Sequence, residues 1–195
     1  MHVPVLLEAA IHWLAIRPGG TYVDCTAGAG GHSEAIANAL GSSGRLIAID
    51  LDAEAVGRVS KRLADRENVA VVHANYADLR RVLAEAGITG VDGVLIDAGV
   101  SSPQLDTSER GFSFQREGPL DMRMDTTAGA TAAQLLNSAS EQELTRFLRM
   151  YGDLREARKI ARAIVSRRGT SPIETTRDLV DTVRGVYHWV SGTPE

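Results

Sequence analysis

The chain has 195 residues, enough for one ordinary domain or for one domain with an inserted lobe. Its composition is globular, 44% apolar and 24% charged, and its net charge of −4 gives no overall signal for binding nucleic acid. A single cysteine excludes a disulfide framework and is compatible with a reducing cytosol, and no apolar run approaches a membrane span. We therefore expect a soluble, cytoplasmic protein.

The charge is nevertheless distributed unevenly along the chain. Between residues 146 and 184 there are ten Lys and Arg against five Asp and Glu, so this segment is basic inside an acidic protein. Such an asymmetry predicts contact with phosphate groups.

The first hundred residues alternate between strand and helix patterns. Strands are expected over residues 21–23, 45–51, 69–73 and 91–96. Helices are expected over residues 4–16, 34–40, 53–63 and 78–86, the third of them capped by Asp52. This alternation predicts a parallel sheet with helices on both faces, as in a Rossmann-like α/β domain.

A glycine-rich turn, Asp24-Cys-Thr-Ala-Gly-Ala-Gly-Gly-His-Ser33, joins the first strand to the next helix. Its glycines permit a sharp turn and a close approach of a ligand to the backbone. Asp50 ends the second strand, 22 positions after Gly28, where such units keep a carboxylate for a ribose hydroxyl. Together these features predict a nucleoside-containing cofactor.

The residues around the turn favour one cofactor over others. A dinucleotide fingerprint has glycine at position 33, where this chain has Ser33, and no Gly-Lys-Ser/Thr of a P-loop follows. The carboxylate of Asp24 would repel a pyrophosphate but suits a ligand with a positive charge. We therefore expect S-adenosylmethionine rather than NAD.

The alternation ends at residue 98. Residues 98–125 show little periodicity, but their apolar side chains would bury, so we expect a functional loop rather than disorder. Helices follow over residues 131–136, 141–151, 154–168 and 176–186, and Ser140 and Glu143 form a capping box for the second. The chain thus predicts an α/β region followed by a helical lobe.

The fourth strand presents a physical difficulty. In the usual strand order the run Val94-Leu-Ile96 lies next to the second half of the sheet, and it is too apolar for an open edge. Either another chain covers this edge or the sequence stops short of the remaining strands, and we favour the second explanation.

Residues 99–125 carry three uncommon strings, Gly99-Val-Ser-Ser-Pro-Gln-Leu-Asp106, Glu109-Arg-Gly-Phe-Ser-Phe114 and Gly118-Pro-Leu-Asp-Met-Arg-Met-Asp125. With further strings at residues 2–8, 30–33 and 159–164, they resemble the RsmH (MraW) family of 16S rRNA cytosine-N4 methyltransferases. The resemblance implies methylation of a cytidine N4 in the decoding region, with S-adenosylmethionine as cofactor and the small ribosomal subunit as partner. It implies no DNA partner and leaves the oligomeric state open.

The resemblance also implies site residues. The family's cofactor contacts fall on Gly30, Gly31, His32, Asp50, Tyr76, Asp97 and Gln104. Asp97 is in addition the candidate catalytic residue, because it follows the fourth strand and can contact the cofactor or accept a hydrogen from the target amine. Backbone carbonyls and water are alternative proton acceptors, and the histidines and the cysteine show no metal-ligand spacing. Tyr76 stands where the family usually has phenylalanine.

Two groups of residues are candidate RNA contacts. Phe112 and Phe114, flanked by Arg110, Arg116 and Arg123, could stack a base and hold its phosphates, or the rings could simply pin the loop to the core. A second group, at helical spacing on one face, is slightly favoured as a phosphate contact over a solvated face. It consists of Arg155, Arg158, Lys159 and Arg162.

The family continues beyond the length of this chain, and its helical lobe is inserted between the two halves of the sheet. We therefore expect a cofactor-binding Rossmann-like domain over residues 1–105 and a helical substrate-recognition insertion over residues 106–195. The main alternative is a non-catalytic remnant that binds S-adenosylmethionine or RNA without turnover. A DNA cytosine methyltransferase is disfavoured because Asp97 is followed by Ala-Gly-Val-Ser-Ser-Pro, and a nicotinamide dehydrogenase is disfavoured by Asp24 and Ser33.

Overall fold

The computed structural model describes residues 6–187, which form two units. The first comprises residues 6–101 and 124–127, and the second comprises residues 102–123 and 128–187. The boundary expected after residue 105 falls inside α5 (Ser102–Asp106), which belongs to the second unit. The roles assigned to the two parts stay a prediction.

The first unit contains a parallel four-stranded sheet, which confirms the predicted Rossmann-like α/β fold. The strand order is β3-β2-β1-β4. The strands are β1 (Thr21–Asp24), β2 (Arg45–Asp50), β3 (Val69–His73) and β4 (Gly93–Leu95). The last is shorter than the expected 91–96, because β4 pairs with β1 alone and only over three residues.

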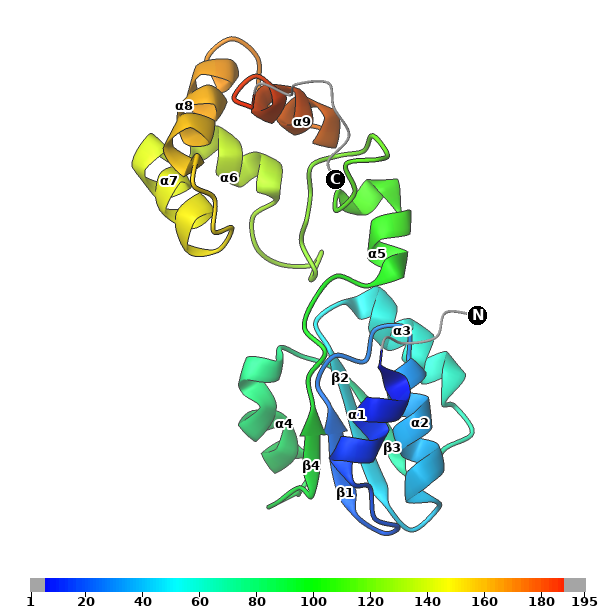
Figure 1. Ribbon diagram of the computed structural model, residues 1–195. Coiled ribbons are helices and arrows are strands. Elements are labelled where there is room, and N and C mark those ends of the chain that lie inside the picture. The colour runs from blue at the N-terminus through cyan, green and yellow to red at the C-terminus, as the bar shows by residue number, and fades with distance from the viewer. Residues whose placement is uncertain (1–5, 188–195) are drawn as a thin grey trace. The chain divides into compact units, whose positions relative to one another are not determined.

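Helices cover both faces of this sheet, as the sequence predicts (Figure 1). On one face lie α1 (Leu7–Leu14), α2 (Gly31–Leu40) and α3 (Ala53–Arg62). The other carries α4 (Leu79–Glu85), which follows a short 3-10 turn at Tyr76–Asp78. Alternate strand residues face opposite ways, so Tyr22 and Leu46 pack with α2 while Val23 and Ile47 pack with Val82 of α4.

The fourth strand lies at the edge of the described sheet. Val94 and Ile96 are 39% and 55% exposed, although both are large apolar residues. The exposed apolar edge expected from the sequence is therefore present in the structure.

The second unit is helical, and its four predicted helices are confirmed. They are α6 (Ala132–Ser138), α7 (Glu141–Met150), α8 (Ala157–Arg168) and α9 (Thr176–Arg184). The predicted capping box of Ser140 and Glu143 begins α7. The buried core of this unit is formed by Leu120, Leu144, Ile160, Ala161, Ile164 and Ile173.

Residues 98–125, expected from the sequence to form a long loop, include two short helical segments. They contain α5 and a 3-10 turn at Ser108–Arg110, and their later part pairs with the start of α9. Leu120 donates its N–H to the carbonyl of Glu174 at 2.8 Å, and Thr176 donates to the carbonyl of Gly118 at 3.0 Å. A five-residue helix is too short to show periodicity, and this pairing joins residues far apart in the sequence.

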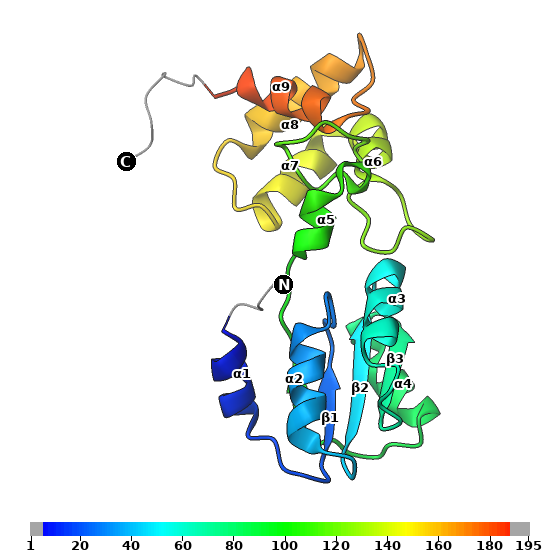
Figure 2. The same cartoon turned by 90° about the vertical axis from the view of Figure 1, so that its right-hand side faces the viewer.

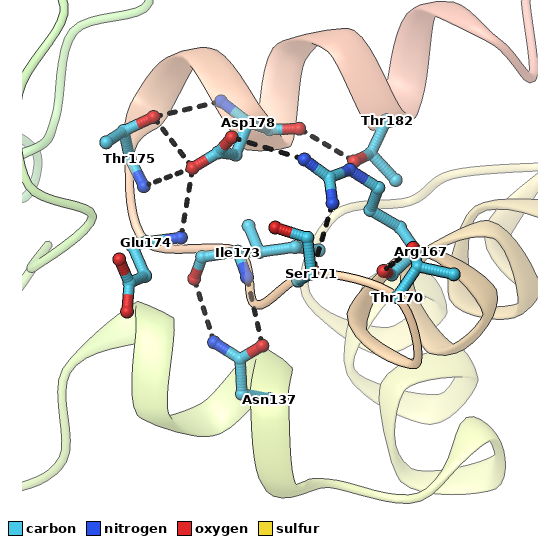
Figure 3. Close-up of polar contacts among 9 residues, drawn as sticks. All are labelled: Asn137, Arg167, Thr170, Ser171, Ile173, Glu174, Thr175, Asp178 and Thr182. Carbon is cyan, nitrogen blue, oxygen red and sulfur yellow. Dashed lines mark hydrogen bonds and ion pairs between the residues drawn. The ribbon is translucent and has the colours of Figure 1, made fainter.

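The loop between α8 and α9 is held by side chains (Figure 3). The amide of Asn137 donates to the carbonyl of Ile173 at 2.8 Å and accepts from the N–H of the same residue at 3.0 Å. Thr175 and Asp178 then form the capping box of α9, and Arg167 lies 3.6 Å from the Asp178 carboxylate. Side chains from α6, α8 and α9 thus fix this loop in place.

Candidate functional site

The candidate cofactor residues of the first unit gather at the carboxyl edge of the sheet. Because the strands are parallel, all of them end at the same edge, where open α/β sheets bind ligands (Figures 1 and 2). The glycine turn follows β1 and Asp50 ends β2. Tyr76 follows β3 and Asp97 follows β4. The structure therefore brings these predicted residues to one edge.

The glycine turn has a backbone that suits glycine alone at its centre. Gly30 has a φ of 86°, and a Cβ there would meet the Arg62 side chain at 3.0 Å. Arg62, from α3, donates to the carbonyl of Ala29 at 3.0 Å and to Glu34 at 2.6 Å. The turn is therefore braced by α3 as well as by its own sequence.

The first turn of α2 presents unused backbone donors. Gly30 is the N-cap and makes no side-chain cap hydrogen bond. Within the described residues, the N–H groups of Gly31, His32 and Ser33 have no acceptor, whereas the N–H of Glu34 donates to the Gly30 carbonyl. Such a helix start attracts an anionic group, for example the carboxylate of an amino acid.

Asp50 is connected directly to the glycine turn. Its Oδ2 accepts from the N–H of Gly28 at 2.7 Å, and its Oδ1 accepts from the N–H of Asp52 at 2.8 Å. The residue is half-buried, and each carboxylate oxygen retains a second lone pair. Asp50 is thus oriented by the backbone and still able to accept a hydroxyl hydrogen.

Asp24 does not present a charge to a ligand, contrary to the electrostatic argument from sequence. The residue is fully buried, its Oδ2 accepts from the Ser33 hydroxyl at 2.6 Å, and its Oδ1 accepts from the Thr26 N–H at 3.1 Å. Burial raises the pKa of this carboxyl, although both hydrogen bonds oppose the change. Asp24 and Ser33 therefore hold the turn together.

His32 and Asp97 form a second polar pair at this edge. The His32 ring is 8% exposed, and its Nδ1 lies 3.8 Å from Oδ2 of Asp97, whose side chain is 62% exposed. The N–H of Asp97 donates to the Thr26 hydroxyl at 2.8 Å. The backbone of Asp97 is therefore anchored while its carboxylate is open to an incoming group.

Tyr76 and Gln104 differ in their surroundings. Tyr76 is 48% exposed at the carboxyl edge of the first unit, so its ring is available to a flat ligand. Gln104 lies on α5 of the second unit and is 4% exposed there. Its contact with the cofactor stays a prediction.

The arginines beside the two phenylalanines are mostly occupied within the protein. Arg110 is buried, with its guanidinium 6.0 Å from the centre of the Phe112 ring. Arg123 makes a two-pronged contact with the Asp121 carboxylate at 2.9 and 2.7 Å. Both arginines thus make contacts within the protein, and their role in holding phosphates stays a prediction. Phe114, at 76% exposed, remains available for stacking.

The predicted basic surface is present, although Arg155 precedes α8 and only the other three cations lie on the helix. Arg155, Arg158, Lys159 and Arg162 are exposed and, with Glu156, line a shallow hollow of about 360 Å³. The ion pair of Lys159 with Glu156, at 2.8 Å, raises the pKa of the lysine. Sequence spacing does not reveal a second hollow of about 540 Å³, because it is lined by α7 together with Arg158.

The described residues offer neither a metal site nor a membrane-spanning helix. Across residues 6–187, no group of three or more His, Cys, Asp or Glu side chains is arranged to hold a metal ion. The helices of this part of the chain are all too short or too polar to cross a bilayer.

Comparison with known proteins decides the family. A family model described as the MraW methylase family matches residues 1–192. The chain belongs to this family. The resemblance inferred from the sequence is confirmed.

Curated relatives with the same printed name support this assignment. The chain is 53% identical over 179 residues to "Ribosomal RNA small subunit methyltransferase H" of Chromobacterium violaceum, covering 92% of this chain and 56% of the relative. It is 48% identical to the protein of that name from Alteromonas mediterranea, covering 93% of this chain and 58% of the relative. The chain therefore spans little more than half the length of the relatives it matches.

Solved structures show partial likenesses. An rRNA methylase from Streptococcus thermophilus is 22% identical with a TM-score of 0.35, covering 42% of this chain and 49% of that chain.

Proposed function

We propose that this chain is part of an enzyme that uses S-adenosylmethionine to methylate N4 of a cytidine in the decoding region of 16S rRNA. The proposal depends chiefly on the family match over residues 1–192, together with relatives named for methylation of the small-subunit RNA. The geometry of the first unit agrees with a nucleoside cofactor at the carboxyl edge of the sheet.

The residues of the turn fit this cofactor, which supplies the methyl group when bound. The open N–H groups of Gly31 and His32 would receive its carboxylate, and Asp50 would accept from the ribose hydroxyls. The exposed Tyr76 ring would pack against the adenine. Gln104 is proposed as a further contact, from the second unit.

Asp97 is proposed as the residue that receives the amine proton or orients the amine. The lone pair of a cytosine N4 is delocalised into the ring, so the reaction depends on alignment of N4 with the methyl group. Correct orientation contributes about 7–11 kcal/mol in the best intramolecular cases. The exposed carboxylate of Asp97, with its backbone anchored on Thr26, suits a group that must meet an incoming base.

The second unit is proposed to hold the RNA. Phe114 offers an exposed ring on which a base could stack. Phe112, two residues earlier, has its ring next to the guanidinium of Arg110. The exposed cations of α8, with Arg155 just before it, offer phosphate contacts.

The test is calorimetry with S-adenosylmethionine followed by methyl transfer to small-subunit RNA. We expect binding that is weakened at least tenfold by Asp50→Ala, and nucleoside digestion that yields N4-methylcytidine. A product methylated on carbon 5 would contradict the proposed N4 chemistry. Failure of the wild-type chain to bind S-adenosylmethionine would contradict the cofactor site.

A second candidate is a module that binds S-adenosylmethionine or RNA without turnover. It is favoured by one observation, the exposed apolar fourth strand at the edge of a four-stranded sheet. Binding with no methyl transfer, under conditions where a full-length relative is active, would favour this second candidate.

A further inference from the structure

The two hollows on the second unit are adjacent parts of one surface. The first is lined by Arg155, Glu156, Arg158, Lys159 and Arg162, and the second by Glu141, Gln142, Thr145 and Arg158. Arg158 lines both hollows, so they meet at its side chain. We call this continuous surface the α7–α8 groove.

The cations of the groove are not equivalent. Lys159 is paired with Glu156 at 2.8 Å, and Arg162 lies 3.8 Å from Glu141. Within the described residues, Arg155 and Arg158 have no carboxylate partner within 4 Å. The carboxylates beside Lys159 and Arg162 partly offset the positive charge of those side chains. Arg155 and Arg158 are therefore the positive groups most available to an anion.

The second hollow has a different chemistry. Gln142 is exposed and has no hydrogen-bond partner in the described part of the chain, and the Thr145 hydroxyl donates to the carbonyl of Glu141 at 2.7 Å. An amide and a hydroxyl oxygen can bind hydroxyl groups. The one carboxylate here faces one cation, whereas the one carboxylate of the first hollow faces four, so the second hollow is the less favourable for phosphate. The groove therefore changes from anion-binding to hydroxyl-binding on crossing Arg158.

The groove is built on a firm support. Leu144 of α7 and Ile160, Ala161 and Ile164 of α8 are all nearly fully buried in one core. The capping box of Ser140 and Glu143 fixes the start of α7 next to Glu141 and Gln142. The core therefore fixes the backbone of the two helices from which Gln142 and Arg158 project.

We propose that the α7–α8 groove binds the ribose–phosphate backbone of an RNA strand, with phosphates at Arg155 and Arg158 and a ribose hydroxyl at Gln142. In such a backbone each phosphate lies next to a ribose, so an anion-binding hollow beside a hydroxyl-binding one suits it, and the 2′-hydroxyl distinguishes RNA from DNA. This inference rests on the proposed function, because it takes RNA as the substrate. It can nevertheless be tested by RNA binding alone, without methyl transfer.

The experiment measures fluorescence anisotropy of a short, unstructured, labelled oligoribonucleotide with the whole chain over a range of salt concentrations. The double variant Arg155→Gln/Arg158→Gln should weaken binding on the order of tenfold or more and reduce the log–log salt slope by about 1.4, the value for two lost single-strand phosphate contacts. Lys159→Gln/Arg162→Gln, which removes the same charge, should have a clearly smaller effect.

A third pair provides the control for charge alone. Lys61→Gln/Arg80→Gln removes two exposed cations from α3 and α4 of the first unit and should leave RNA binding unchanged. Circular dichroism of each variant confirms folding. Equal losses in all three pairs, or wild-type affinity in Arg155→Gln/Arg158→Gln, would overturn the proposed phosphate contacts.

The hydroxyl contact is tested with DNA of the same sequence. Wild type should bind RNA more tightly, and Gln142→Leu should weaken RNA binding while DNA binding stays constant. Equal wild-type affinity for RNA and DNA would refute the ribose contact. If methyl transfer fails while these binding results are obtained, the proposed function is contradicted but RNA binding by the groove is supported. If methyl transfer occurs without these binding results, only RNA binding by the groove is contradicted.

Discussion

Asp24 lies at the end of β1 with both carboxylate oxygens hydrogen-bonded inside the protein, to Ser33 and Thr26. Burial disfavours its charged form more than these bonds favour it, so its pKa is raised from 3.8. Between the unfolded-state pKa and the higher folded-state pKa, the folded protein binds more protons than the unfolded chain. The contribution of Asp24 to stability therefore falls as pH rises through that window.

The variant Asp24→Asn preserves the shape and removes this titration. Its free energy of unfolding relative to wild type should therefore improve as pH rises from about 4 towards neutrality. Asp92→Asn is the control, because the Thr21 N–H and Arg17 lower the pKa of Asp92, so its difference from wild type should be constant above about pH 4 and shrink only below 3.8. Urea unfolding at several pH values gives both curves. Parallel curves for the two variants would contradict the burial argument.

Gly111 offers a second residue-scale prediction. Its φ is 71°, and a Cβ would clash with the carbonyl of Pro119 and lie 2.7 Å from the N–H of Asp121. Gly129 has a similar φ of 80° but open space around it. Gly129→Ala should cost about 1–2 kcal/mol for the left-handed conformation alone.

Gly111→Ala adds overpacking against backbone and should cost roughly 1–3 kcal/mol more than the Gly129 variant. The comparison of urea midpoints isolates the contact, since both sites carry the same backbone strain. Equal midpoints would mean that the segment around Pro119 moves aside without cost.

At the scale of elements, local chemistry accounts for most of what the sequence predicts. The caps at Asp52 and Ser140 and the spacing of apolar residues predict the helices that they begin, because both signals lie within a few residues. The glycine turn and Asp50 are likewise local features. The burial of Asp24, the pairing of Leu120 with Glu174 and the α7 side of the groove depend on packing between distant segments, so no local pattern contains them.

The start of α9 carries an element-scale prediction. The Asp178 carboxylate accepts from the Thr175 N–H at 3.0 Å, the Thr175 hydroxyl at 2.9 Å and the Glu174 N–H at 3.2 Å, which lowers its pKa. Asp178→Asn should destabilise the protein by about 0.5–2 kcal/mol at neutral pH. A carboxylate whose pKa is lowered on folding stabilises the protein fully only above its unfolded-state pKa. The difference in unfolding free energy between wild type and Asp178→Asn should therefore vanish as pH falls below 3.8 and through the folded-state pKa.

Asp181→Asn is the control for this cap. Asp181 lies on the same helix and is exposed, with Arg184 at 3.9 Å as its ion-pair partner. An exposed pair of this kind contributes about 0–1 kcal/mol, so its loss should change the urea midpoint little. A larger effect at Asp181 than at Asp178 would contradict the capping interpretation.

At the scale of the molecule, the two units carry different parts of the proposed chemistry. The open N–H groups of α2, Asp50, Tyr76 and Asp97 belong to the first, whereas Gln104 and the α7–α8 groove belong to the second. Ligand binding stabilises the part that makes the contacts. Cofactor and RNA should therefore protect different segments from hydrogen exchange.

Hydrogen exchange with S-adenosylmethionine tests this division directly. At a ligand concentration of 100 times Kd, linkage stabilises the bound unit by about 2.7 kcal/mol, which slows exchange that requires opening of the site by up to roughly 100-fold. We expect this protection around residues 24–33 and 50–52 and none in α7 or α8. Protection of α5 would support contact with Gln104. At the same ligand concentration, Asp50→Ala should reduce the slowing of exchange to roughly tenfold or less, because its affinity is at least tenfold weaker. Protection confined to the helices of the second unit would contradict the cofactor site, because it would place the ligand away from the glycine turn and Asp50.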